Sequence, residues 1–324
     1  MASALSQVYH WARTISRAAL LLTIALIGAI HLAGSSLSLS AQLVIALIGL
    51  AIGIPHGAID HLISIPRDPR SRFFLYIAGY VAIAVVAGIA IATWNLVAFD
   101  LVLIMSGLHF GFGDASFINE SRSASSQKSE PLWVEILYAL PAGFLPVVLP
   151  LTDHRTLSAL ERIRPALVNW SGTNTQTLRT SIFILTTISL IALLLTKRFG
   201  LAIDISLLAL LSIFAPPLVA FAIYFGLWHA LRHTARLIPR LPKAVAFADA
   251  GSTRSAFIAA VVPGLYAVGG SFALAAVLMV TSPQKFSSSL LWSVLVIIWA
   301  LTVPHMLSTA RLDRASLKGL FPLR

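Results

Sequence analysis

Residues 73–93 read FFLYIAGYVAIAVVAGIAIAT, which is 21 consecutive residues without a charged side chain. A helix needs ~20 predominantly apolar residues to cross the hydrocarbon core of a bilayer. The rest of the chain has the same character, since 58% of its 324 residues are hydrophobic and 11% are charged. Soluble domains are about a quarter charged, and the mean hydropathy here is +0.88. These values exclude a soluble enzyme, a disordered chain and a coiled coil, and they predict an all-α, polytopic transmembrane helical bundle.

We expect about ten membrane spans, within a range of eight to ten, in a single integral membrane domain over residues 1–324. Residues 1–15 are expected to form a cytoplasmic N-terminal segment and residues 313–324 a cytoplasmic tail. The short stretch 199–214 is compatible with a full span, a re-entrant segment or the first half of a broken helix. The expected spans are 16–33, 40–64, 71–94, 97–118, 131–150, 178–196, 199–214, 216–237, 255–281 and 287–312.

Basic residues predict the orientation of these spans. Lys and Arg gather in cytoplasmic loops because their translocation is disfavoured. With both termini cytoplasmic, only five of the 23 Lys and Arg fall on the outer side, and the other 18 fall inside. The net charge of +11 would suggest nucleic acid in a soluble protein; here it indicates loops facing an anionic leaflet, and no nucleic-acid partner. The connection at 151–177 is partly amphipathic and is expected to lie along the outer interface.

Six of the nine histidines fall well inside the predicted spans, on helices that run in the same direction, and a seventh, His31, sits near the outer end of the first span. His56, His109, His229 and His305 lie about 7 to 9 residues before the cytoplasmic ends of their helices, on the order of 10–14 Å deep. His233 lies one turn beyond His229, and His61 follows His56 closely. By contrast, His10, His31 and His154 are expected in loops or near the interface. Ionisable groups inside a membrane usually face the bundle interior, so we expect one polar site.

The local patterns refine the chemistry of that site. His229 and His233 are four residues apart, which places both imidazoles on one helix face. No glutamate follows His229, so the H-E-x-x-H protease motif is excluded. Asp60 lies one turn after His56 and could orient its imidazole, as carboxylates often do for metal-bound histidine. Asp114 follows His109 by five residues, and a helix-end carboxylate is the alternative reading for both aspartates.

Imidazoles without thiolates suit Fe(II), Zn(II) or Cu(II), and the chain has no cysteine. Aromatic residues near the motifs could line an apolar tunnel for a lipid-soluble substrate, or simply pack in the core; those selected are Phe110, Phe112, Tyr224 and Trp228. The same histidines would also suit a metal- or proton-translocating transporter, a bis-histidine cytochrome, or separate structural roles. The absence of a detectable repeat and the position of the histidines away from the midplane weigh against a transporter.

Four motifs carry a family resemblance, namely PHGAIDH at 55–61, HFGFGD at 109–114, WHALRH at 228–233 and VPHML at 303–307. In this order and approximate spacing they resemble the Brp/Blh family of bacterial and archaeal integral membrane β-carotene 15,15′-dioxygenases. The resemblance covers residues from about 45 to 312. The first span, at 16–33, is not shared by the shortest members.

The resemblance implies cleavage of the central double bond of β-carotene by O₂ at a non-haem Fe²⁺ ion, giving two molecules of retinal. It implies His56, His109, His229 and His233 as catalytic iron ligands. Asp60, Asp114, His305 and His61 are expected to support these ligands from outside, and the role of His305 is less defined. It further implies a multi-pass protein of the bacterial or archaeal inner membrane, with retinal handed on to a rhodopsin.

Overall fold

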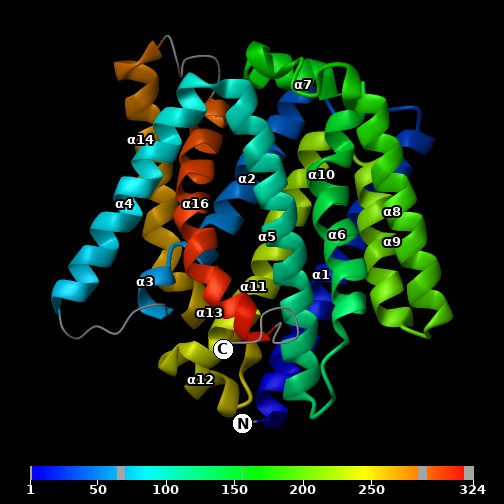
Figure 1. Ribbon diagram of the computed structural model, residues 1–324, viewed down its shortest axis with the longest axis vertical. Helices are drawn as coiled ribbons and strands as arrows, with labels where there is room; N and C mark the ends of the chain where they lie inside the picture. Colours follow the sequence, from blue (N-terminus) through cyan, green and yellow to red (C-terminus); the bar gives the residue numbers. More distant parts are fainter. Residues whose placement is uncertain (1, 64–69, 155, 284–289, 317–324) are drawn as a thin grey trace.

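The computed structural model describes residues 2–63, 70–154, 156–283 and 290–316. Within these ranges the chain is helical and contains no strand, which confirms the all-α class. The long helices pack side by side into one bundle (Figure 1). Their bounds are α1 (Ala2–Leu32), α2 (Leu39–Gly57), α3 (Asp60–Ile63), α4 (Arg70–Thr93), α5 (Asn95–Ala124), α6 (Leu132–Val147), α7 (Thr156–Ile163), α8 (Thr175–Leu195), α9 (Phe199–Phe214), α10 (Pro217–Ile223), α11 (Ala230–Leu237), α12 (Pro242–Asp249), α13 (Thr253–Val261), α14 (Leu265–Thr281) and α16 (Leu290–Ser316).

Short 3₁₀ or π segments connect several of these helices. A π-helical segment, η4 (Tyr224–His229), joins α10 to α11. Among the 3₁₀ turns, η1 (Leu149–Thr152) follows α6 and η6 (Val262–Gly264) joins α13 to α14. The other 3₁₀ turns are η2 (Pro165–Leu167), η3 (Gly172–Asn174) and η5 (Ile238–Arg240).

Seven helical stretches of the described residues are long and apolar enough to cross a membrane, and they include α1, α2, α4, α5, α8, α13 with α14, and α16. Two further apolar helices, α6 and α9, are shorter than a full span. The segment expected at 216–237 is helical but changes from α to π and back to α. All ten expected segments are therefore largely helical within the described residues, and seven of them have the length and composition of a membrane span. The count of ten spans and their orientation stay predictions.

The ambiguous stretch 199–214 forms one α-helix, α9, which stops at a proline pair. Ala215 is extended, with φ −77° and ψ 146°, and α10 begins at Pro217. The residue before a proline is biased toward extended backbone, which ends the helix there. Helix α9 packs on α1, α6 and α8 with one face, and its other face, which includes Phe199, Ile203 and Phe214, is exposed.

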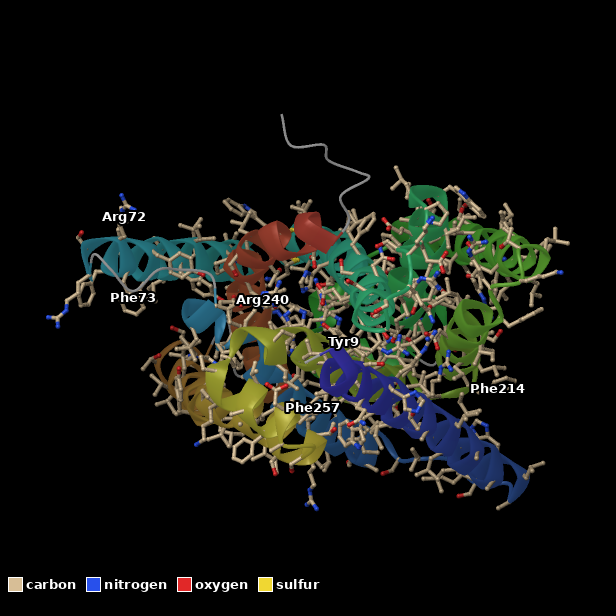
Figure 2. The ribbon with its side chains drawn as sticks, turned by 90° about the horizontal axis from the view of Figure 1, so that it is seen from below. Tyr9, Arg72, Phe73, Phe214, Arg240 and Phe257 are labelled. Atoms are coloured by element: carbon tan, nitrogen blue, oxygen red, sulfur yellow. The ribbon has the colours of Figure 1, made fainter. Side chains whose placement is uncertain are left out.

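Helix α4 stands at the edge of the bundle, where it presents a largely apolar surface outward. Figure 2 shows Arg72 and Phe73 at the outer tip of this helix, away from the other helices. The side chains of Phe74, Leu75 and Val86 are 65–75% exposed. The outer face of α4 is therefore apolar and exposed, as lipid contact would require, and its inner side packs on α16.

Two glycines let α5 and α6 approach at backbone distance. A Cβ atom on Gly143 would lie 1.8 Å from the carbonyl oxygen of Gly107, and one on Gly111 would lie 2.0 Å from that of Ala139. Neither clash can be relieved by moving a side chain, because backbone atoms are involved. Small residues at helix interfaces allow this close packing in membranes, and here they fix α5, which carries His109.

We expect Gly143→Val to destabilise the protein, because the added side chain would force α5 and α6 apart. Overpacking of this kind costs about 1–3 kcal/mol or more. The melting temperature in detergent, followed by size-exclusion chromatography, measures the effect. Gly28→Val is the matched control, since a Cβ at Gly28 meets nothing within 4 Å; equal melting temperatures for the two variants would contradict the prediction.

Both ends of the described chain are helical. Helix α1 begins at Ala2, and Val8 and Ala12 are fully buried, so residues 2–15 are the first turns of a packed helix, and their cytoplasmic location stays a prediction. Similarly, α16 continues to Ser316, and residues 317–324 of the expected tail lie outside the described residues. At one end of the bundle, α7 lies across the other helices (Figure 1) and buries one face, which supports the amphipathic reading of 151–177.

Candidate active site

Five of the six histidines expected inside the membrane gather in one buried cluster, the histidine cluster. None of these five side chains is more than 8% exposed. They come from distant parts of the chain: His56 lies in the last turn of α2, His109 in α5, His229 at the end of η4, His233 in α11 and His305 in α16. Four separate helical segments thus bring imidazoles to one point.

The ring contacts define a simple geometry. The centroid of His56 lies 5.3 Å from that of His229 and 5.6 Å from that of His305. His109 lies 5.4 Å and 5.2 Å from the same two rings, so the four form a closed circuit. His233 lies 5.2–6.4 Å from each of the four. These contacts are those of a square pyramid with His233 at its apex.

Six ring nitrogens of the cluster are buried without a hydrogen-bond partner: Nε2 of His109 and His305, and both nitrogens of His229 and His233. A buried polar atom left unpaired is costly, and a bound cation would give these nitrogens a partner. As they stand, no three His, Asp or Glu side chains of the described residues form a group ready to hold a metal. The donor set and its unpaired nitrogens fit a metal, provided that the rings turn about their side-chain torsions to share it.

Two imidazoles of the cluster are held through Nδ1. The Nδ1 atom of His56 is paired with the carbonyl oxygen of Gly53. The Nδ1 atom of His305 is 2.7 Å from Oδ2 of Asp60. A hydrogen-bond partner at Nδ1 fixes the orientation of the ring and leaves the Nε2 lone pair to ligate a metal, as is usual for metal-ligating histidines.

The expectation that Asp60 orients His56 is wrong. The carboxylate instead holds His305, and its Oδ2 also accepts from Ser308 Oγ at 2.8 Å and from the hydroxyl of Tyr80 at 3.4 Å. The reason is local: α2 ends at Gly57, so the four-residue helical spacing between His56 and Asp60 is lost. Nothing in the sequence indicated the Tyr80 and Ser308 contacts, because they join Asp60 to two helices, α4 and α16, that are distant from it along the chain or across the bundle.

Asp114 supports the cluster through an indole. Its Oδ2 accepts from Nε1 of Trp228 at 2.5 Å, and the Trp228 ring carries the Arg232 guanidinium at 3.4 Å from its centroid. Trp228 directly precedes His229, while Asp114 lies on the helix of His109. The carboxylate thus ties two histidine-bearing helices together and contacts no imidazole by a hydrogen bond.

Arg232 and Arg236 belong to the 18 basic residues expected on the cytoplasmic side, and the structure buries both in the bundle interior. Both are 1% exposed or less. Asp204 faces Arg232 at 3.3 Å, and Glu120 faces Arg236 at 3.1 Å. Buried charges persist only when they are paired, and these carboxylates supply the pairing. Arg232 and Arg236 lie on either side of His233 along α11. Their ion pairs therefore fix the helix that carries His233.

The π-helical segment η4 was not predicted. It ends at His229 and sets the angle of that ring against His233, with centroids 5.8 Å apart and planes at 28°. π-turns inside α-helices occur frequently at functional sites. Gly226 in this segment meets the Gly49 carbonyl oxygen of α2, at 2.9 Å from where a Cβ would lie. No residue pattern distinguishes such a segment from an α-helix in the sequence.

An apolar cavity of about 230 Å³, the lateral cavity, reaches the histidine cluster from one side. It touches His56, His109 and His305 but neither His229 nor His233, so it meets the base of the pyramid and not its apex. Its other walls come from α4, α14 and α16, with Tyr76, Tyr80, Tyr266, Ser271, Leu301 and Thr302 among them. Since Tyr266 is 65% exposed, the cavity extends to the outer surface of the bundle.

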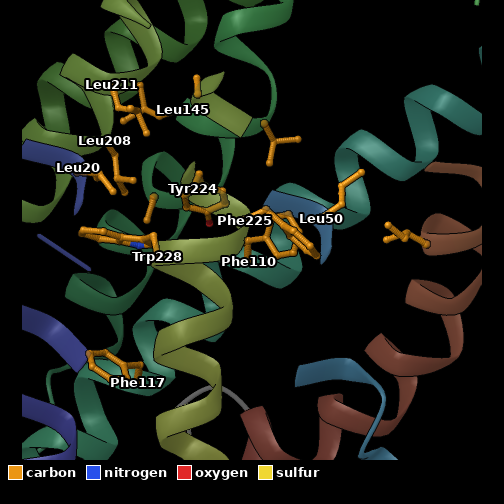
Figure 3. Packing of buried hydrophobic residues seen from close by; sticks show 14 of the residues in the cluster. Leu20, Leu50, Phe110, Phe117, Leu145, Leu208, Leu211, Tyr224, Phe225 and Trp228 are labelled. Carbon is orange, nitrogen blue, oxygen red and sulfur yellow. The ribbon is translucent and has the colours of Figure 1, made fainter. Parts of the chain in front are cut away.

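Of the four aromatic residues expected to line a tunnel, Phe110 lines the lateral cavity. Figure 3 shows Phe110 beside Phe225, with Tyr224 and Trp228 on the same segment as Phe225. Tyr224 and Trp228 are fully buried in packing, and neither they nor Phe112 is among the residues that line this cavity. Phe225, another aromatic residue beside the same motifs, lines the lateral cavity together with Phe110.

The other histidines are separate from the cluster wherever they are described. His10, His31 and His154 have exposed side chains, and His154 lies 3.3 Å from Asp153. The backbone of His61 belongs to α3, but its side chain lies outside the described residues, so its predicted supporting role stays a prediction.

Comparisons with known proteins place these features in context. Residues 47–313 match the family model described as beta-carotene 15,15′-dioxygenase. A curated protein of that name from uncultured marine bacterium 66A03 is 28% identical over 265 residues, covering 79% of this chain and 88% of that protein. No solved structure shows a significant match. The matched region begins in α2 and contains all five members of the histidine cluster.

Proposed function

Because the chain belongs to the β-carotene 15,15′-dioxygenase family, we propose that it cleaves the central double bond of β-carotene with O₂ and releases two molecules of retinal. One oxygen molecule supplies one oxygen atom to each new aldehyde, so the equation balances without another reductant. The observation that carries this proposal is the buried histidine cluster at the inner end of an apolar cavity.

The proposed cofactor is Fe²⁺, held by His56, His109, His229 and His233. Neutral imidazoles suit this ion, and three of these residues have buried ring nitrogens without a partner. When bound, iron in such a ligand set supplies the activation of O₂ toward an electron-rich alkene. The protein's own part is to place the imidazoles, exclude water and hold the polyene in register.

We extend the ligand set to His305 as a fifth imidazole. Its ring lies within 5.6 Å of those of His56, His109 and His233, and its Nε2 is buried without a partner. In the proposed state, Asp60 accepts a hydrogen bond from the Nδ1–H of His305. The proton of the neutral imidazole then sits on Nδ1, and the lone pair is on Nε2, which points away from the carboxylate. This is the carboxylate–histidine arrangement that orients metal ligands, so Asp60 is a positioning residue.

The lateral cavity is the proposed site of substrate access. β-Carotene is a hydrocarbon that dissolves in the bilayer, and the cavity joins the lipid-facing surface at Tyr266 to the histidine cluster. Phe110 and Phe225 form its inner wall, with their centroids 6.0 Å apart. Their faces suit a conjugated polyene, because aromatic and π-systems stack in offset arrangements. The apolar lining would also keep water from the reacting double bond.

The transporter alternative is not favoured, because the family match and the curated relative both carry a dioxygenase name. Residence in the cell membrane, with the apolar helices across the lipid bilayer, and transfer of retinal to a rhodopsin stay part of the proposal. Retinal is itself lipid-soluble, so it could leave through the same lateral cavity.

We expect expression of the chain in a β-carotene-accumulating bacterium to bleach the cells and to produce retinal. Two molecules of retinal should appear for each carotene lost, because cleavage is central. Extraction and chromatography measure both compounds, with an empty-vector strain as the control. Unchanged pigment in cells that contain the membrane-inserted, iron-supplied protein would overturn the proposed function.

A further inference from the structure

A second apolar cavity, the distal cavity, lies near the histidine cluster but on its other side. It has a volume of about 90 Å³ and is lined by residues of α5, α6, η1, α7, α10 and α16. Resting on the function proposed above, we propose that the distal cavity binds the ring-bearing end of the far half of the polyene while the near half lies in the lateral cavity.

Three helices place the two cavities in the same order. Along α5, the distal cavity takes residues from Phe99 to Ser106, and the lateral cavity then takes His109 and Phe110. At 1.5 Å per residue, Ser106 lies about 4.5 Å and Phe99 about 15 Å along the axis from His109. The distal cavity therefore begins one helical turn from a proposed ligand and extends away from it.

The same order recurs elsewhere. On α16, the distal cavity takes Leu295 and Trp299. The lateral cavity takes Ile298 and then continues through Leu301 to His305, so the two cavities overlap over about one turn of this helix before the lateral one continues alone. On the α10–η4 segment, Phe221 borders the distal cavity and Phe225 the lateral one. Since α5 and α16 run in the same direction (Figure 1), the distal cavity lies on the α7 side of the histidine cluster. A linear molecule with its middle at the cluster would reach both cavities.

Aromatic rings form the partition between the cavities. Phe221 stacks on Phe225 with centroids 5.7 Å apart and planes at 10°, and Phe225 contacts Phe110 at 6.0 Å. Both sides of this partition are apolar, and side-chain rotation of rings is the motion that would join them. A polyene passing here would exchange one stacked contact for another.

Helix α7 closes the distal cavity on its outer side. Its buried residues Thr156, Ala159, Leu160 and Ile163 all line the cavity, and their spacing is that of one helix face. The Thr156 hydroxyl donates to the carbonyl oxygen of Pro150 at 2.5 Å, so it offers the cavity no free donor. An apolar cavity without free polar groups suits hydrocarbon better than water, and here the hydrocarbon would be the ring-bearing end of the substrate.

The test fills the cavity at its α7 wall. Ala159→Phe adds one aromatic ring to a space of about 90 Å³. Leu157→Phe is the matched control, because Leu157 lies on the same helix and its side chain is 48% exposed. Purified, iron-supplied proteins are compared on β-carotene and on an apocarotenal that keeps one ring and lacks the far end. We expect Ala159→Phe to lower the ratio of β-carotene to apocarotenal cleavage roughly tenfold or more, and Leu157→Phe to leave it unchanged.

A second variant shows whether a changed ratio comes from the cavity or from a misfolded protein. Leu160→Ala enlarges the same cavity, and we expect it to raise the relative cleavage of carotenoids with bulkier rings. Wild-type ratios in both Ala159→Phe and Leu160→Ala, with normal elution in size-exclusion chromatography, would overturn the inference while wild-type cleavage upheld the function. Failure of the wild-type protein to cleave either substrate would instead overturn the proposed function itself.

Discussion

The variant His229→Ala is expected to lose iron and carotene cleavage together, with activity falling by more than about a hundredfold. Loss of a residue that only supports a ligand already costs 10–100-fold, and His229 is proposed as a ligand itself. Its ring contacts those of His56, His109 and His233, and both of its nitrogens lack a partner. Iron per protein and retinal formed per minute are the two measurements.

Two comparisons make this result specific. His229→Gln has a side chain closer in volume, so equal losses in His229→Gln and His229→Ala separate ligation from packing. His10→Ala, at an exposed histidine of α1, should keep both iron and turnover. Normal iron content and turnover in folded His229→Ala would remove His229 from the ligand set.

Replacing Asp60 by alanine is expected to weaken iron binding and turnover about 10–100-fold, because the His305 imidazole would lose the partner that orients it. Asp60→Asn should lie between this variant and the wild type, since an amide oxygen still accepts from Nδ1 but carries no charge. Competition with a chelator measures iron affinity independently of activity.

Ser308→Ala is the matched control for Asp60. It removes one donor to the same Oδ2 atom but leaves the contact with His305 intact. We expect it to change iron affinity far less than Asp60→Ala does. If Asp60→Ala and Ser308→Ala lowered melting temperature alike while iron affinity stayed at the wild-type value in both, Asp60 would be a structural residue only.

The helices and the meeting of the histidines were accessible from sequence for one physical reason. A chain that crosses lipid must satisfy its backbone hydrogen bonds internally, which favours long apolar helices. Residues at the same depth on neighbouring helices can then meet where those helices pack. His56, His109, His229 and His305 satisfied this condition, and their side chains do meet.

Features that depend on a change of backbone course could not be predicted in this way. Asp60 contacts His305 because α2 ends at Gly57, and η4 arises where Gly226 approaches α2. The burial of Arg232 was missed for a different reason, since its partner Asp204 is 28 residues away in sequence. Pairings between distant helices leave no periodic signal in a single chain.

The opening of the lateral cavity beside α4 and α14 has a kinetic consequence. A hydrocarbon substrate that arrives through the side of the bundle is delivered by diffusion in two dimensions, so its relevant concentration is the mole fraction in the surrounding lipid. Turnover should then follow the ratio of carotene to lipid or detergent, and diluting that ratio at constant bulk concentration should slow the reaction. On the proposed route, half-saturation values for this protein would be expressed as surface concentrations.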